Sequence, residues 1–432
     1  MTNQEELVQR KIKRPPLIPY LLLGYVWKMI YFRKLGVEVE CRIDMKQYRR
    51  TPLVMISNHA SRLDYIYTGL ACLPMRFNFV AGYNEFFRSH LAFIFRLLQI
   101  IPKKNFVADM YSMKSIRSII KSGGKVCLYP EGMSSISGAN QPVCAGTGKF
   151  LKKLGVPVLM TRISGGYLTS TKYCLEERPG KVHVIVDRLF TAGQLERMSD
   201  QEIQDSINTA IKNDDYQWNS KVGAEFSCGG KVAENLHTLL YKCPVCGAEF
   251  HMEGKGNSIS CSVCGNGAIL DDRYVMTSIR KGCRIPSTPR DWLDWQRHEV
   301  RKEIADPSFC LVEKVRLGNI PSDHFLKDQK TSEIVGEGVL TLNRDGLAYK
   351  GTRNGEAFEF FIDSRSLPTY GMCTDISRFY TFYKGEFMEF YPEHSTVEKW
   401  FLATEEIHRM NEGPWRDFVD AEEREKVSWT AF

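Results

Sequence analysis

The stretch SNHASRLDY, residues 57–65, follows the apolar run PLVMI and places a histidine five positions before an aspartate. On one continuous helix, five positions correspond to about 500°, so His59 and Asp64 would not share a helix face. The two side chains can meet only if His59 precedes the first helical turn. Ser57 and Asn58 end a predicted strand and Ser61 is a good N-cap, so we expect the chain to bend there and bring Asp64 to the imidazole.

The surrounding sequence predicts an α/β domain. From Pro52 to about Asn213, predicted helices starting near Ser61, at the run FRSHLAFIFRLLQ and at Asp109 alternate with the strand candidates PLVMIS, FNFVA, KVCLYP, VPVLMTRI and KVHVIV. This order indicates a mostly parallel sheet flanked by helices, with ligands bound at the carboxyl ends of the strands. His59 lies at one such end.

A second motif, YPEGMSS at residues 129–135, also follows a predicted strand. Its Pro-Glu-Gly turn leaves a carboxylate and backbone N–H groups at the same edge of the sheet. A histidine oriented by a carboxylate can take a proton from a hydroxyl that attacks a thioester, which contributes roughly 10²- to 10⁴-fold in rate. The alternative is that Asn58, His59 and Asp64 only cap a helix, and the second motif favours the catalytic interpretation.

Together, SNHASRLD and YPEG resemble the glycerophospholipid acyltransferase family typified by lysophosphatidate acyltransferase, over roughly residues 17–213. The resemblance implies transfer of a fatty acyl group from acyl-CoA or acyl-carrier protein to the hydroxyl of a lysophospholipid, first of all 1-acylglycerol-3-phosphate, in phospholipid biosynthesis. It also implies that His59 is the general base and Asp64 its orienting partner. Asn58, Glu131 and Gly132 would belong to the substrate-binding site.

Two departures from the family pattern concern phosphate binding. The family commonly has an arginine where this chain reads Pro102-Lys103-Lys104, and another where it reads Ser134. Lysine binds phosphate as a point charge without the bidentate fork of arginine, so the acceptor is held less specifically or is a different lysolipid. We predict Lys103, Lys104 and Ser134 as substrate-binding residues, and the alternative for the two lysines is a solvated basic turn.

Four cysteines predict a structural metal site. CPVCG at 243–247 and CSVCG at 261–265 are two Cys-x-x-Cys pairs with 14 residues between them, each followed by glycine. Four thiolates close a tetrahedral zinc sphere, and binding contributes on the order of 10 kcal/mol to folding such a segment. The sequence therefore predicts a zinc ribbon, with redox chemistry as the alternative, and with the ligands Cys243, Cys246, Cys261 and Cys264.

The N-terminal region predicts contact with an acidic surface. Up to Lys125 there are 21 Lys and Arg against 8 Asp and Glu, although the whole chain carries only +7. The apolar run 17–32 is shorter than the roughly 20 residues of a spanning helix and is flanked by basic residues, so it suits the headgroup layer. Spanning and burial in the core are the alternatives. Thirteen cysteines without a cleavable signal indicate reduced thiols and the cytoplasmic face.

The remainder predicts a helix at 290–304 and a C-terminal antiparallel β domain with a hairpin at Asp345-Gly346 and a final helix at 397–410. This domain resembles pleckstrin-homology-like or GRAM-like modules, and any small barrel is the alternative. The irregular composition of 214–232 predicts a linker. The predicted parts are an N-terminal membrane-associating helical segment (1–50), an acyltransferase domain (51–232), a zinc ribbon (233–275), a helical linker (276–305) and the β domain (306–432).

The sequence as a whole predicts a membrane-associated acyltransferase. A lipid-binding relative without turnover is the alternative, motivated by Ser134 in place of arginine. Nucleic acid is not an expected partner, because residues 241–273 contain few basic residues and no basic-aromatic stripe. The headgroup, the acyl-chain preference, the donor and the oligomeric state are not fixed by these patterns.

Overall fold

Strand β2, which precedes the SNHASRLDY stretch, lies in the middle of a mostly parallel sheet. In the computed structural model, which describes residues 2–327, 330–373, 375–414 and 427–430, the sheet has seven strands in the order β1-β7-β6-β2-β5-β3-β4. Neighbouring strands are parallel except for β6 with β7, so the predicted fold class is confirmed. The strands are β1 (Val37–Cys41), β2 (Leu53–Ser57), β3 (Asn78–Gly82), β4 (Ile101–Lys103), β5 (Lys125–Leu128), β6 (Val158–Ser164) and β7 (Val182–Phe190).

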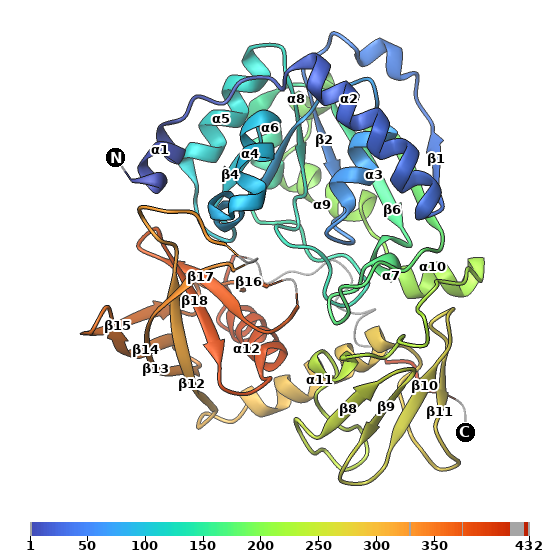
Figure 1. Cartoon of the computed structure of the whole chain (residues 1–432), viewed down its shortest axis with the longest axis vertical. Helices are drawn as coiled ribbons and strands as arrows, with labels where there is room; N and C mark the ends of the chain where they lie inside the picture. Colours follow the sequence, from blue (N-terminus) through green and yellow to red (C-terminus); the bar gives the residue numbers. More distant parts are fainter. Residues whose placement is uncertain (1, 328–329, 374, 415–426, 431–432) are drawn as a thin grey trace.

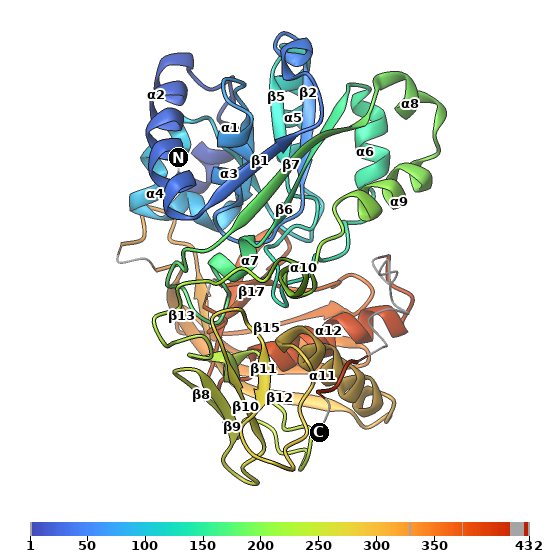
Figure 2. The same ribbon diagram turned by 90° about the vertical axis from the view of Figure 1, so that its right-hand side faces the viewer.

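Helices cover both faces of this sheet (Figure 2). Side chains alternate along a strand, so Leu53 and Met55 of β2 pack in one core cluster with α3, while Val54 and Ile56 pack in another with α5, α6 and α9. The helices of this part are α1 (Asn3–Gln9), α2 (Leu17–Trp27), α3 (Asp64–Ala71), α4 (Ser89–Leu97), α5 (Met110–Lys121), α6 (Thr147–Leu154), α7 (Gly166–Thr169), α8 (Ala192–Arg197), α9 (Asp200–Ala210) and α10 (Asp215–Val222), with the short helices η1 (Lys28–Phe32), η2 (Met45–Tyr48) and η3 (Tyr83–Phe87).

Three predicted boundaries differ from the structure. Strand β1 lies within the segment 1–50 that was predicted to be helical, and it pairs with β7 as a polar edge strand, so the sheet begins before residue 51. Helix α3 begins at Asp64 rather than at Ser61. Helix α10 occupies part of the predicted linker 214–232, because the side chain of Asp214 caps it by accepting the backbone N–H of Gln217.

The cysteine-rich segment forms a four-stranded antiparallel sheet in the order β11-β10-β9-β8 within the described residues. Its strands are β8 (Met252–Lys255), β9 (Ser258–Cys261), β10 (Gly267–Leu270) and β11 (Met276–Ser278), preceded by η4 (Leu236–Thr238). The long helix α11 (Pro289–Ile304) then leads to the C-terminal domain, as the sequence predicted.

The C-terminal domain is an antiparallel sheet with the order β15-β14-β13-β12-β18-β17-β16 among the described residues, closed by helix α12 (Val397–Met410). The predicted hairpin joins β13 to β14 around Asp345. The strands are β12 (Cys310–Asn319), β13 (Glu333–Asn343), β14 (Gly346–Arg353), β15 (Glu356–Asp363), β16 (Gly371–Met372), β17 (Phe379–Tyr383) and β18 (Glu386–Pro392).

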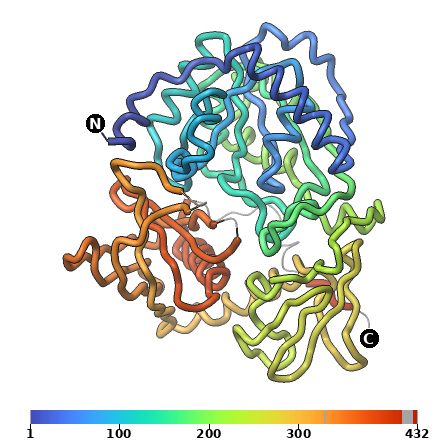
Figure 3. The backbone as a smooth tube through the Cα atoms, viewed as in Figure 1, coloured from blue at the N-terminus to red at the C-terminus, as the bar shows by residue number. Residues whose placement is uncertain are grey.

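The three parts pack against one another. Figures 1 and 3 show the C-terminal domain and the cysteine-rich sheet side by side beneath the sheet that carries β2. One core cluster contains Tyr167 of α7, Ile259 of β9 and Trp400 of α12. Helices α11 and α12 are joined by buried ion pairs, in which Arg297 binds Glu405 at 2.7 Å and Glu406 at 3.0 Å. Unfolding of one part would therefore remove packing contacts from the other two.

Candidate active site

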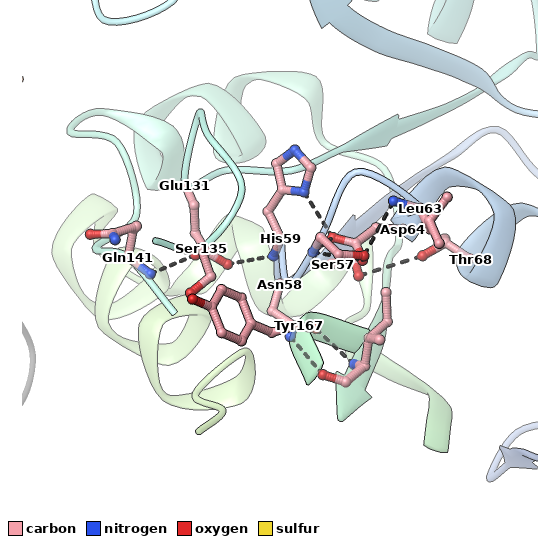
Figure 4. A network of polar contacts seen from close by, with 12 residues as sticks. Ser57, Asn58, His59, Leu63, Asp64, Thr68, Glu131, Ser135, Gln141 and Tyr167 are labelled. Carbon is pink, nitrogen blue, oxygen red and sulfur yellow. Dashed lines mark hydrogen bonds and ion pairs between the residues drawn. The ribbon is translucent and has the colours of Figure 1, made fainter. Parts of the chain in front are cut away.

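His59 and Asp64 meet at the carboxyl end of β2. His59 lies in the loop before α3, and its Nδ1 is 2.8 Å from Oδ2 of Asp64 (Figure 4). The buried carboxylate also accepts the backbone N–H of Ser61, at 3.1 Å and 3.0 Å, and the hydroxyl of Ser61 at 3.2 Å. Burial raises the pKa of Asp64, and the contacts with His59 and Ser61 oppose this shift.

This arrangement makes the second ring nitrogen of His59 a base. In the neutral imidazole whose Nδ1–H donates to the carboxylate, Nε2 carries the free lone pair, and Figure 4 shows that nitrogen pointing away from Asp64. The ring stacks on Tyr129 with 4.5 Å between the ring centroids, and 23% of the His59 side chain is exposed. Tyr129 directly precedes the Pro-Glu-Gly turn and was not predicted as a site residue. Its position at the end of a strand, next to that turn, is the sequence feature that could have indicated a contact with His59.

Two predicted substrate ligands are instead buried behind His59. Glu131 accepts the backbone N–H of His59 at 2.6 Å and that of Gln141 at 2.5 Å. Asn58 exchanges two 2.8 Å hydrogen bonds with the backbone of Ile163. Neither side chain lines the cavity described below, so the prediction that Asn58 and Glu131 contact substrate does not fit the structure. Both residues hold the backbone that carries His59.

His59 opens into a cavity of about 1690 Å³. Of the other predicted ligands, Gly132, Ser134 and Lys103 line this cavity. The Nζ of Lys103 donates to the carbonyls of Lys104 and, at 3.1 Å, of Val107, and burial lowers its pKa. Helices α2, α4 and α5 contribute to the apolar part of the wall, which includes Leu23, Ile94, Phe95 and Ile116.

Lys104 does not line the cavity and contacts the C-terminal domain. Its Nζ donates to the carbonyl of Gly385 at 2.5 Å and lies 5.7 Å from the ring centroid of Phe382 and 5.0 Å from that of Tyr83. A cation held over two aromatic rings is a packing contact. The predicted substrate-binding role of Lys104 therefore does not fit its position.

The C-terminal domain forms part of the cavity wall. Met372, Arg378, Tyr380 and Glu389 line the same cavity as His59. Neither motif indicates this contact, because it depends on how two distant segments dock. The domain that carries His59 and the C-terminal domain thus enclose one cavity.

The four predicted zinc ligands lie together in the cysteine-rich sheet. Their sulfur atoms all lie within 4.8 Å of one another, with 3.6 Å between Cys243 and Cys264 and 3.7 Å between Cys246 and Cys261. Four thiolates about 2.3 Å from a tetrahedral zinc ion are separated by about 3.8 Å, so the set fits this metal. None of the four lines the cavity, which agrees with a structural role.

The glycines that follow each pair allow the backbone to turn around such a metal. Gly247 and Gly265 have φ angles of +71° and +70°, in the left-handed region that favours glycine. Sulfur contacts of 3.6 Å and 3.7 Å also link cysteines of the two different Cys-x-x-Cys motifs. All four sulfur atoms therefore form one cluster, as a shared tetrahedral ion requires, whereas a redox pair needs only the two cysteines of one motif.

One comparison with known proteins concerns the domain that carries His59. Residues 38–164 match the family model described as Acyltransferase. This segment runs from β1 to the end of β6 and carries both His59-Asp64 and the Pro-Glu-Gly turn. The chain therefore contains an acyltransferase domain.

Six solved chains match this protein in structure. One is the 1-acyl-sn-glycerophosphate (LPA) acyltransferase PlsC from Thermotoga maritima, at 19% sequence identity and a TM-score of 0.38, over 44% of this chain and 76% of that chain. A likeness of this strength supports no statement about activity. None of the curated proteins is similar enough in sequence to count as a match.

Proposed function

We propose that this protein transfers a fatty acyl group from a thioester, acyl-CoA or acyl-carrier protein, to the hydroxyl of a lysophospholipid, with 1-acylglycerol-3-phosphate as the first candidate. The observation that carries the proposal is the imidazole of His59, oriented by Asp64 and open to a cavity with an apolar wall. The acyltransferase match of residues 38–164 supports the reaction class.

The geometry gives each residue of the pair one task. Nε2 of His59 takes the proton of the acceptor hydroxyl while the oxygen attacks the thioester carbonyl. The new ester C–O bond forms, the C–S bond breaks, and the thiol leaves with the proton that the imidazolium returns. Asp64 holds the ring by accepting Nδ1–H and stabilises the imidazolium that forms when Nε2 takes the proton.

The direct test is an assay of acyl transfer with the purified full chain. We expect oleoyl-CoA labelled in the acyl group to give labelled phosphatidate with lysophosphatidate as acceptor. A panel of phosphate, choline, glycerol and amino-acid lysolipids, assayed at equal concentrations, will rank the headgroups. Tight lysolipid binding with no product from any acceptor, with either CoA or carrier-protein donors, would contradict the proposal and indicate a non-catalytic lipid-binding protein.

Membrane association at the cytoplasmic face is part of the same proposal. Among the described residues no helix combines the length and apolar character needed to cross a bilayer. Helix α2 and η1 nevertheless leave Ile18 78% and Met29 77% exposed, and Phe93 of α4 is 75% exposed. Other residues of α2 and α4 line the cavity, so this apolar surface adjoins the route of a lipid substrate. Exposed apolar residues beside basic ones suit the lipid interface.

We expect the double variant Ile18→Glu/Met29→Glu to bind phosphatidylserine-containing vesicles at least about tenfold more weakly than the wild type, because two apolar contacts of about 1.5–3 kcal/mol each are lost and two charges face the acidic surface. Vesicle co-sedimentation measures this change. Val312→Glu is the matched control, since Val312 is also exposed but lies on β12 of the C-terminal domain. Equal sedimentation of the wild type and the double variant would exclude this docking face.

A further inference from the structure

Lys172 is a buried cation without a partner. It follows α7, and its residue is only 9% exposed. Among the residues that the structure describes, its ammonium group has no hydrogen bond and no ion pair within 4 Å. Lys172 lines the cavity into which His59 opens. It also lines a small hollow beside that cavity, whose other lining residues are Ala60, Ser61, Arg62, Ser134, Ser135, Ser170 and Thr171. Its Nζ is not among the fully buried unpaired atoms, so the ammonium group is accessible to a ligand in the cavity although most of the residue is buried.

The acidic groups nearest to Lys172 are already engaged. Asp375 and Glu85 act on Lys172 through space, but Glu85 binds Arg88 at 2.8 Å and Asp375 lies 3.6 Å from Arg378. Burial lowers the pKa of Lys172 to about 8, so at neutral pH most molecules still carry the charge. Lys172 therefore faces the cavity as a cation that has no ion pair of its own among the described residues.

A second cation and a hydroxyl lie on the same hollow. Arg62 and Ser134 line both the hollow and the cavity, as Lys172 does. The guanidinium of Arg62 is anchored without a carboxylate, as Nε donates to Ser170 Oγ at 3.1 Å and one terminal nitrogen donates to the carbonyl of Leu175 at 2.6 Å. Within the described part of the chain, Arg62 has no acidic partner. Fixed donors and an unpaired ammonium are what an anion requires.

The hollow adjoins the loop that carries His59, and its volume of about 10 Å³ holds a water molecule but no phosphate, so a phosphate bound by Lys172 would lie in the adjoining cavity. The wall of the hollow begins at Ala60, the residue after His59, and Ser135, also in this wall, donates its backbone N–H to the carbonyl of His59 at 2.6 Å. In 1-acylglycerol-3-phosphate the free hydroxyl and the phosphate are on adjacent carbons. A hydroxyl placed at His59 must therefore have its phosphate bound nearby.

We propose that Lys172, together with Arg62 and Ser134, binds a phosphate group carried by a substrate. The identity of that substrate rests on the proposed function, but the phosphate chemistry rests on the cavity itself. Two substrates carry phosphate, since the acceptor has it in the headgroup and the donor has it in coenzyme A or in the carrier-protein arm. Lys172 and His59 line the same cavity, and Ala60 next to His59 lines the hollow with Lys172, which favours the acceptor.

The test measures binding directly, without turnover. Isothermal titration of the full chain with sn-glycerol 3-phosphate probes the acceptor headgroup, and titration with coenzyme A probes the donor. Lys172→Met is expected to weaken the binding of one probe about 10- to 100-fold, the effect of losing one charge-assisted hydrogen bond, while Lys172→Arg retains most of the affinity. Lys153→Met is the matched control, because Lys153 is exposed on α6 outside the cavity.

The outcomes separate this inference from the proposed function. Weaker binding of glycerol 3-phosphate alone assigns the site to the acceptor, and weaker binding of coenzyme A alone assigns it to the donor. Equal affinity of wild type and Lys172→Met for both probes, or no binding of either probe to the wild type, would overturn the inference. If Lys172 binds phosphate but no acyl product forms with any acceptor, only the proposed function fails.

A melting experiment excludes a purely structural role for Lys172. Replacing an unpaired buried ammonium group with methionine removes a desolvated charge and keeps the apolar stem, so we expect the melting temperature of Lys172→Met to equal or exceed that of the wild type. A structural role predicts a lower melting temperature and unchanged affinity for both probes. That result would also overturn the inference.

Discussion

His59→Gln is expected to lower kcat for acyl transfer by about 10²- to 10⁴-fold, because glutamine offers a hydrogen-bond donor to Asp64 but no base to the acceptor hydroxyl. The fold should persist, since the backbone N–H of His59 that Glu131 accepts is unchanged and the side chain is partly exposed. The labelled oleoyl-CoA assay measures the loss, and circular dichroism checks the fold.

A matched histidine change controls for non-specific effects. His251→Gln replaces an exposed histidine in the cysteine-rich sheet, outside the cavity, and should leave kcat unchanged. If His59→Gln turned over at the wild-type rate, the acceptor hydroxyl would be activated by some other group, and the proposed mechanism would be wrong.

Loss of the metal is the change expected to have the largest effect on stability. We expect about one zinc ion per chain by atomic absorption, and we expect Cys261→Ser or a strong chelator to lower the melting temperature by more than about 10 °C. Structural zinc supplies on the order of 10 kcal/mol to the folding of such a segment, and a loss of a few kcal/mol already shifts the melting of a domain by several degrees. The ribbon residue Ile259 shares its core cluster with Tyr167 and Trp400, so unfolding of the ribbon should weaken the other two parts as well.

An exposed cysteine outside the cluster separates the metal effect from a general effect of cysteine loss. Cys310→Ser, on β12, should melt as the wild type does. A folded chain that contains no zinc, or a Cys261→Ser variant with unchanged melting temperature, would contradict the metal assignment.

Local patterns were sufficient where the chain itself determines the geometry. The distance from His59 to Asp64 follows from a bend between a strand and a helix, so the sequence predicted that the two side chains can meet. The cysteine cluster follows in the same way from two short motifs, each with a glycine that turns the backbone. The mostly parallel sheet follows from alternating strands and helices, whose buried strands are continuous apolar runs.

Other features depend on tertiary packing that no local pattern contains. The Pro-Glu-Gly turn predicts an exposed carboxylate at Glu131. In the structure its two oxygens accept the backbone N–H groups of His59 and Gln141, which are far apart in the chain. The sequence predicted Lys104 as a phosphate ligand, but its side chain contacts the turn after β17. The β1 strand was not predicted because its side chains are largely polar and exposed, as an edge strand allows. It therefore lacks the apolar run that identifies the buried strands.

The central claim is that His59 and Asp64 act as one catalytic unit, and a double-mutant cycle on kcat tests it most directly. The account predicts that Asp64→Asn lowers kcat and that the double variant loses no more than His59→Gln alone, because the carboxylate acts only through the imidazole. Losses that multiply in the double variant, so that each residue contributes independently of the other, would contradict it.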